Sequence, residues 1–231
     1  MRVFRGRVGT IDADREASGR LLEVAAEGEP AVRVWTPHRQ VAFGRRDSRL
    51  EGYDRAREAA REREFPPIER SVGGRAVAYD GETTLAFARA EPIADFRRGT
   101  DERYERLTAA VANALEELGV GLERGEPDDS FCPGAHSLST PSVTGLRKIA
   151  GIAQRVRQDA ALVSGILVVD GREELARVLE EVYGALEVPF DPESVGSMAA
   201  AGGPSDPERI ARTLENELTG DREREVVELS R

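Results

Sequence analysis

Two strand-like runs that follow one another closely, residues 148–155 and 160–169, constrain the fold of this chain more than any other feature. The first alternates from Lys148 onward and contains a glycine, Gly151, where another group approaches the backbone closely. The second is the longest apolar run in the sequence, but Ser164 and Gly165 interrupt it and it is too short to span a bilayer. We therefore expect these runs to form an antiparallel pair of strands.

Shorter patterns place further elements around this pair. Alternating residues predict strands over 2–7, 31–35, 40–43 and 83–87, and the turn Thr36-Pro37 suggests that 31–35 and 40–43 form a hairpin. Apolar residues at helical spacing, or polar runs of helix-forming residues, predict helices over 12–27, 53–64, 101–118, 173–183 and 206–218. Strands and helices do not alternate regularly, which favours an α+β fold with antiparallel-rich mixed sheets flanked by helices.

The chain has 231 residues and no composition break that demands a second domain. We expect one domain over 1–220 and a charged, frayed tail over 221–231.

The net charge is −10, and most arginines are interleaved with acidic residues, so the composition disfavours a nucleic-acid partner. The first residues, MRVFRGRV, lack the apolar core of a signal peptide, and a lone cysteine forms no internal disulfide; we expect a cytoplasmic protein without a membrane partner.

The segment 131–155 holds the only cysteine, Cys132, and the only lysine, Lys148. The pair Pro133-Gly134 follows the cysteine and predicts a tight turn, which presents a side chain instead of packing it. A lone cysteine can also be a small buried hydrophobic residue, and a lone lysine can survive by chance in a composition that favours arginine. Lysine differs from arginine in offering a compact charge whose pKa shifts when it is desolvated, so its retention at one strand position points to chemistry.

Two stretches together resemble the biotin/lipoate protein ligase superfamily, within it the lipoate-protein ligase A family. Residues 70–80, RSVGGRAVAYD, are similar to the Arg-x-x-Gly-Gly-x-Ala-Val-x-x-Asp loop of lipoate-protein ligases and octanoyltransferases, and residues 148–155, KIAGIAQR, to their lysine motif. The hairpin region 32–45 resembles the segment that precedes the loop. The resemblance implies the catalytic-domain fold of that superfamily, which is similar to class II synthetases. It also implies substrate-binding positions at Arg70, Gly73, Gly74, Arg75, Ala76, Val77, Asp80, Gly151, Ile152, Ala153 and Gln154.

Residues 131–134, FCPG, followed by Leu138-Ser139, most resemble the cysteine-dependent octanoyltransferase branch, whose members are amidotransferases acting on the octanoylated glycine cleavage H protein. This resemblance implies that an octanoyl or lipoyl group moves between lysines of lipoyl-domain proteins through a thioester on Cys132. The implied partners are the H protein and the E2 subunits of 2-oxoacid dehydrogenases, and the implied protein is a monomer that needs no cofactor. The chain departs from this branch at His136-Ser137 and in an inserted loop around residues 140–144.

Two alternatives stay open. An ATP-dependent lipoate-protein ligase would act through lipoyl-adenylate with ATP and Mg²⁺, and Cys132 would then be incidental. The chain departs from the ligase pattern at Arg75, in place of a third loop glycine, and at Tyr79, in place of histidine, and both departures argue against an adenylate pocket. A lipoate-binding subunit that needs a separate accessory domain is the other alternative. No resident metal is expected, because His38 and His136 have no ligand partners at zinc-site spacing.

Elementary chemistry suggests roles for the candidate residues. A free thiol is only roughly 3% thiolate at pH 7, so the catalytic Cys132 gains from a nearby cation. Lys148 can supply that charge or, as we favour, donate a hydrogen bond to the acyl carbonyl oxygen. His136 is a candidate general base for the incoming lysine, or an exposed loop residue. Small residues can leave an apolar slot for the acyl chain, namely Gly73, Gly74, Ala76, Gly151 and Ala153; we expect Gln154 and Arg155 to shape the pocket or contact the acceptor.

Overall fold

The computed structural model describes residues 1–70 and 74–229 of the chain, so the predicted position Gly73 lies outside the described residues. In the described part, eight strands form one mixed sheet and three short strands form a second one. The order in the large sheet is β11 (Glu225–Glu228), β1 (Arg2–Arg5), β2 (Ala31–Trp35), β6 (Thr84–Pro92), β10 (Ala160–Val168), β9 (Gly145–Val156), β8 (Ser137–Ser142) and β7 (Glu123–Arg124). The order in the small sheet is β4 (Pro67–Glu69), β3 (Gln40–Phe43) and β5 (Val77–Tyr79).

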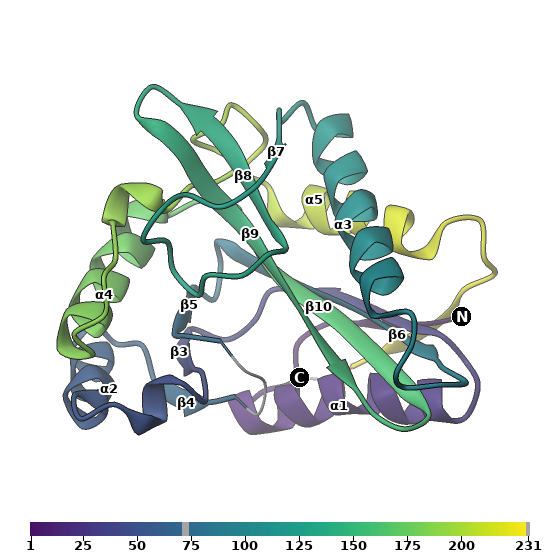
Figure 1. Cartoon of the computed structure of the whole chain (residues 1–231). Coiled ribbons are helices and arrows are strands. Elements are labelled where there is room, and N and C mark those ends of the chain that lie inside the picture. Colours follow the sequence, from purple (N-terminus) through teal and green to yellow (C-terminus); the bar gives the residue numbers. More distant parts are fainter. Residues whose placement is uncertain (71–73, 230–231) are drawn as a thin grey trace.

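Helices cover both faces of the large sheet (Figure 1). Helices α3 (Thr100–Glu117) and α5 (Pro207–Thr219) pack against one face. On the other face lie α1 (Ile11–Ala26) and the small sheet, which is covered in turn by α2 (Tyr53–Glu62) and α4 (Arg172–Ala185). Two single-turn helices, Asp47–Arg49 and Pro192–Ser194, complete the regular structure of the described residues.

Strand β6 shows why the sheet is covered on both sides. Its side chains alternate between the two faces, so Leu85 and Phe87 enter the core beneath α3 and α5, while Ala88 and Ala90 face α1. All four side chains are buried. Large residues on one face and alanines on the other let α1 approach the sheet closely. The sequence pattern of a strand buried on both faces is therefore a nearly continuous apolar run.

The predicted antiparallel pairing at the centre of the fold is confirmed. Strands β9 and β10 pair in antiparallel register from Ala150 opposite Leu167 to Val156 opposite Ala161. Among the described residues of the large sheet, two pairings are parallel, β1 with β2 and β1 with β11, and the others are antiparallel. The expected α+β class with antiparallel-rich mixed sheets and flanking helices is likewise confirmed. None of the helices in the described ranges combines the length and the apolar character that crossing a membrane requires.

The predicted hairpin between residues 31–35 and 40–43 is wrong. Both segments are strands, but β2 pairs with β1 and β6 in the large sheet, whereas β3 pairs with β4 and β5 in the small one. A short link containing Pro37 suits a hairpin and a crossing between sheets equally well. The choice is made by partners distant in the sequence, because both strands are buried almost throughout and each needs a neighbour on either side.

Two further segments differ from expectation. The tail over 221–231 is not frayed throughout, because residues 225–228 form β11 and pair in parallel with β1. Val227 packs against the core beneath α1, which explains why a charged segment becomes a strand. The inserted loop around residues 140–144 is the end of a long hairpin, in which β8 pairs with β9 as far as Ser142 opposite Gly145. Strands β7 and β8 were not predicted from the sequence.

Candidate active site

Cys132 lies in the loop between β7 and β8, on a turn that leaves its side chain partly exposed. Its φ angle is 42°, in the left-handed region that a residue with a Cβ seldom adopts. The backbone N–H of Cys132 donates a hydrogen bond to Tyr183 Oη at 2.7 Å, and that hydroxyl donates to the Ala76 carbonyl at 3.0 Å. Tyr183 belongs to α4 and Ala76 precedes β5, so two separate elements hold the strained turn.

Lys148 on β9 is almost fully buried, with a relative exposure of 1%. Its ammonium has three hydrogens and makes three hydrogen bonds: to Glu126 Oε1 at 2.6 Å, to the Phe131 carbonyl at 2.9 Å and to the Cys132 carbonyl at 3.0 Å. A buried charge is stable only when it is paired in this way. The structure therefore brings Lys148 and Cys132 together, but through the backbone of the cysteine.

Glu126 extends this contact along the loop. Besides Lys148, it accepts hydrogen bonds from Ser130 Oγ at 2.5 Å and from the Gly134 N–H at 2.6 Å. One carboxylate thus connects the strand, the residues before the cysteine and the turn after it. Sequence reasoning missed Glu126, although a buried lysine demands a carboxylate, and Glu126 is one of the few acidic residues shortly before Cys132.

Arg70 is the cation in contact with the sulfur. It follows β4 directly, and its N–H bonds the Phe43 carbonyl at 2.9 Å, which continues the ladder with β3. Its Nη2 donates to Cys132 Sγ at 2.9 Å and also to the Arg75 carbonyl. Burial disfavours the charged guanidinium, but the neighbouring charge of Cys132, aided by Tyr79, outweighs burial and raises the pKa of Arg70. The side chain therefore stays positively charged beside the sulfur.

Gly74 is required by the close approach of this sulfur. A Cβ at position 74 would lie 2.8 Å from Cys132 Sγ and 2.8 Å from Arg70 Nη2, and the φ angle of 102° already favours glycine. Gly151 has a comparable role on β9, because a Cβ there would lie 3.3 Å from Lys148 Cε. The close approach expected at Gly151 is confirmed, and the approaching group is the lysine side chain.

The other residues of the predicted loop have structural contacts. Ala76 and Val77 are buried in the core between the small sheet and α4. Arg75 Nη1 lies 3.4 Å from Oδ1 of Asp47, a fully buried residue that also accepts the Gly44 N–H. Burial raises the pKa of Asp47, although Gly44 and Arg75 act in the opposite direction.

Asp80 closes the turn that follows β5. Its Oδ1 accepts the N–H groups of Glu82 and Thr83, and its Oδ2 accepts a 2.7 Å bond from Arg39. Burial alone would favour the neutral acid, but these hydrogen bonds outweigh it and lower the pKa of Asp80. The geometry gives Asp80 a turn-forming role in the folded chain.

The distal part of the lysine motif leads away from Cys132. Gln154 lies six residues beyond Lys148, a separation of about 20 Å along an extended strand. Its side chain accepts a 2.6 Å hydrogen bond from Arg103 Nε and donates to the Thr100 carbonyl, at the start of α3. Ile152 and Ala153 are partly buried on the same strand. The structure therefore places Gln154 at the α3 end of β9, apart from the cysteine and the lysine.

The candidate base His136 packs against α3. Its ring stacks on Tyr104, with ring centroids 3.8 Å apart and planes inclined by 7°. Its backbone carbonyl accepts the Ile152 N–H at 3.0 Å, which ties the loop after Cys132 to β9. A role as general base stays a prediction.

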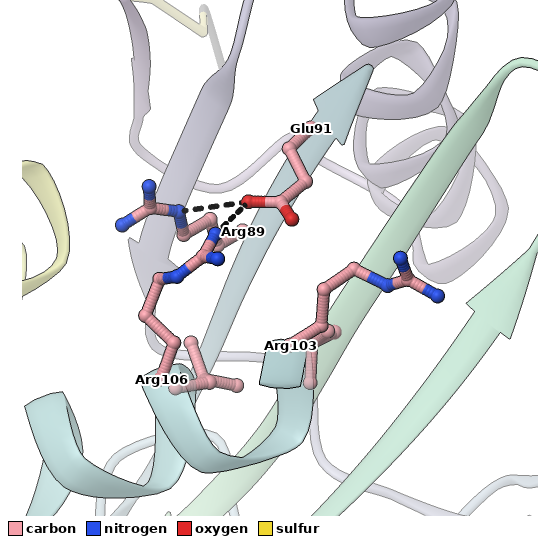
Figure 2. Close-up of a pocket in the computed structure, with 6 residues that line it drawn as sticks. Arg89, Glu91, Arg103 and Arg106 are labelled. Atoms are coloured by element: carbon pink, nitrogen blue, oxygen red, sulfur yellow. Dashed lines mark hydrogen bonds and ion pairs between the residues drawn. The ribbon is translucent and has the colours of Figure 1, made fainter. Parts of the chain in front are cut away.

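Two cavities lie away from Cys132 and Lys148. One of about 10 Å³, which is enough for a single water molecule, is lined by Arg89, Glu91, Arg103, Arg106, Leu107 and Val163. Figure 2 shows Arg89 and Arg106 directed at Glu91, with which both form ion pairs. The other, of about 250 Å³, is lined by Arg63, Phe65, Glu174, Arg177 and Val178. No group of three or more potential metal ligands occurs among the residues that the structure describes.

Solved structures define the class of this fold. Lipoate-protein ligase A bound with ATP superposes with a TM-score of 0.75 at 18% identity, covering 98% of this chain and 88% of the other. The bi-partite lipoate protein ligase of Thermoplasma acidophilum, solved with its E2 lipoyl domain, gives a TM-score of 0.68 at 16% identity, with 98% and 86% covered. The chain therefore has the fold of lipoate-protein ligase catalytic domains.

Sequence comparison is more specific. Residues 18–219 match the lipoyl protein ligase A/B catalytic domain, and the chain belongs to that family. It is 31% identical to octanoyl-GcvH:protein N-octanoyltransferase of Geobacillus kaustophilus over 165 residues, which are 68% of this chain and 56% of that protein. It is 28% identical to lipoyl-GcvH:protein N-lipoyltransferase of Listeria monocytogenes over 157 residues, 66% of this chain and 55% of the relative. The chain thus aligns with little more than half the length of these relatives.

Proposed function

We propose that this chain transfers an octanoyl or lipoyl group between lysines of lipoyl-domain proteins through a thioester on Cys132. The observation that carries the proposal is the 2.9 Å contact between the Cys132 sulfur and a charged guanidinium, on a strained, partly exposed turn. A cation in this position favours the thiolate, which is the nucleophilic form of cysteine. The names of the relatives, an octanoyltransferase and a lipoyltransferase that use GcvH, support this choice of chemistry.

The proposed reaction has two acyl-transfer steps. In the first, the Cys132 thiolate attacks the carbonyl carbon of an acylated lysine on the donor, a C–S bond forms, the amide C–N bond breaks, and the departing amine takes up a proton. In the second, a neutral lysine amine of the acceptor attacks the thioester, an amide forms, the thiolate leaves, and the amine gives up a proton. One proton is taken up and one is released, so the cycle returns the enzyme unchanged. This cycle needs no nucleotide and no metal.

The chain's own residues act on these steps through position and charge. The left-handed turn, fixed by Tyr183 and Lys148, directs the sulfur to Arg70. Gly74 leaves room beside it for Arg70. The predicted hydrogen bond from Lys148 to the acyl carbonyl requires one of its three present contacts to open, because all three ammonium hydrogens already have acceptors.

We propose the H protein as acyl donor and an E2 lipoyl domain as acceptor, with the chain acting as a monomer. The names of relatives that act with GcvH, and a ligase solved with its E2 lipoyl domain, support these partners. A cytoplasmic location suits the reaction, because Cys132 has to remain a free thiol and the cytoplasm keeps thiols reduced. Cell fractionation and sedimentation of the purified chain test the location and the monomer.

A transfer assay tests the function against the ligase alternative. Octanoylated H protein, an unmodified E2 lipoyl domain and the purified chain are mixed without ATP, and acylation of the E2 domain is followed by mass. We expect transfer by the wild type, no change on adding ATP and Mg²⁺, and a loss of at least about a thousandfold in Cys132→Ser. Transfer from free lipoate that requires ATP and survives Cys132→Ser would establish a ligase instead. Activity that appears only after adding a second polypeptide would favour the subunit alternative.

A further inference from the structure

Two cations approach Cys132, but they contact different parts of it. Lys148 bonds the carbonyl oxygens of Phe131 and Cys132 and the carboxylate of Glu126. These are three good oxygen acceptors, and one of them carries a full negative charge. The lysine charge is thus neutralised by Glu126 inside the protein, and its hydrogens are used in holding the loop.

Arg70 contacts the sulfur itself. Its Nη2 lies 2.9 Å from Cys132 Sγ, and the second acceptor of the same nitrogen is a neutral backbone carbonyl, that of Arg75. A neutral thiol is a poor hydrogen-bond acceptor, whereas a thiolate is a good partner for a guanidinium. The arrangement is therefore satisfied best when the sulfur carries the negative charge.

The other titratable groups around the sulfur are either neutral phenols or carboxylates that already pair with another cation. Tyr79 of β5 and Tyr183 of α4 face this region, and burial raises the pKa of both phenols, so both are neutral. Asp47 lies beyond Arg75 and pairs with it. Glu126, from the same loop as Cys132, pairs with Lys148. Among the described residues in these elements, Arg70 is the charged side chain that bonds the sulfur.

We infer that Arg70 is the counter-ion of the reactive Cys132 thiolate, and that Lys148 with Glu126 positions the cysteine loop. The catalytic meaning of this inference rests on the proposed function. Arg70 then acts twice in the cycle, because the guanidinium stabilises the thiolate before it attacks and again when it leaves the thioester. The single lysine, which the sequence presents as the partner of the cysteine, acts on the conformation of the turn.

Thiol alkylation tests this division directly, since Cys132 is the only cysteine and intact mass reports its modification without ambiguity. The rate of Cys132 alkylation by iodoacetamide is measured at pH 7 and at about pH 9.5, where an ordinary thiol is about 90% ionised. The ratio of the two rates reports the ionised fraction of the thiol at pH 7, because differences in access of the reagent cancel. For Arg70→Met we expect this ratio to fall several-fold, towards the roughly 3% of a free thiol, and for Arg70→Lys to fall less.

Two controls separate charge at the sulfur from charge nearby. Arg15→Met removes a guanidinium that bonds the Glu69 carbonyl, next to Arg70 in sequence, and leaves the ratio at the wild-type value. The double variant Lys148→Met, Glu126→Gln removes the pair together, so that no unpaired charge is left buried; it loosens the loop but keeps the guanidinium, so it lowers the ratio less than Arg70→Met does. Circular dichroism verifies that each variant is folded.

The inference is overturned if Arg70→Met keeps the wild-type ratio, or if the double variant lowers it as far as Arg70→Met does. Because the reagent replaces the acyl donor, this result is independent of the transfer assay. A chain that fails to transfer octanoyl groups but loses its low-pH alkylation in Arg70→Met would refute the proposed function and leave the thiolate contact standing.

Discussion

Two arginines, the fully buried Arg33 and the partly buried Arg70, show how contacts separate structure from chemistry. Arg33 on β2 is fully buried and bonds Asp14 Oδ1 at 2.5 Å, the Asp14 and Gly6 carbonyls and Ser18 Oγ. Burial lowers the pKa of Arg33, against the opposing effect of Asp14. Every acceptor of these bonds is an oxygen supplied by the protein, so this buried cation fixes α1 to the sheet.

Arg70 differs in its acceptor. Its Nη2 faces a partly exposed sulfur, whose charge the environment can change, and a single carbonyl. Lys148 resembles Arg33, since its three hydrogens end on oxygen atoms of the protein. Burial and charge alone therefore do not separate a structural cation from the one that we propose to be functional. The partner atom separates them, because it is a protein oxygen for Arg33 and a partly exposed sulfur for Arg70.

The Arg33 region should give the largest effect, and the effect should be on stability. Asp14→Ala leaves the buried guanidinium without its carboxylate, at a cost of about 3–5 kcal/mol in the free energy of unfolding. Urea denaturation measures this, and alkylation of Cys132 in the folded fraction should be unchanged. An Asp14→Ala protein with wild-type stability would break the comparison.

Gly74 should show the opposite behaviour, with a large effect on activity. Gly74→Ala places a Cβ 2.8 Å from both Cys132 Sγ and Arg70 Nη2, so the contact between them has to open. We expect a loss of about 10- to 100-fold in the acyl-transfer rate, consistent with misplacement of a reacting group. Gly28→Ala is the matched control, because that glycine also has a positive φ but nothing lies within 4 Å of its Cβ. Equal losses of transfer in the two variants would contradict the contact-based explanation.

Glu126 should have an intermediate effect, expressed as mobility of the cysteine loop. Glu126→Gln keeps the shape of the side chain but removes the charge that pairs with Lys148, at a cost of about 1–3 kcal/mol. Hydrogen exchange measured by mass should accelerate over residues 126–136 and remain unchanged in α1. Uniform acceleration over both regions would mean that Glu126 stabilises the fold as a whole.

The edge strand β11 should have the smallest effect. Val227→Ala removes two methyl groups from a partly buried position next to the core beneath α1, which costs about 1 kcal/mol. Differential scanning calorimetry should show a small decrease in Tm without a change in transfer rate. An unchanged Tm would indicate that the C-terminal strand contributes nothing to the stability of the sheet.

The elements of this fold could be predicted well from the sequence, because local periodicity determines them. The pair β9 and β10 and the covering helix α3 follow from runs that need no distant information. The pairing partners of the strands could not be predicted in the same way. The hairpin assigned to residues 31–43 and the frayed tail were wrong, because β2, β3 and β11 take partners that lie far away in the sequence.

Prediction of the site from the sequence has the same limit. Residue rarity drew attention to Cys132 and Lys148, and the loop motif to Arg70 and Gly74, and these four do gather in one place. Rarity does not indicate which atom a cation contacts. That depends on the left-handed turn at Cys132, which directs its carbonyl to the lysine and its sulfur to the arginine. Tyr183, which fixes this turn, comes from a helix whose pattern reads only as core.

The most direct test of the account is the intact mass of the chain after incubation with octanoylated H protein in the absence of nucleotide and acceptor. We expect one added octanoyl group, mapped to Cys132 by peptide sequencing and removed by neutral hydroxylamine, as thioesters are. Cys132→Ser should remain unmodified under these conditions, and addition of the E2 lipoyl domain should return the wild type to its original mass. An unmodified wild-type chain that nevertheless transfers the octanoyl group would contradict the thioester.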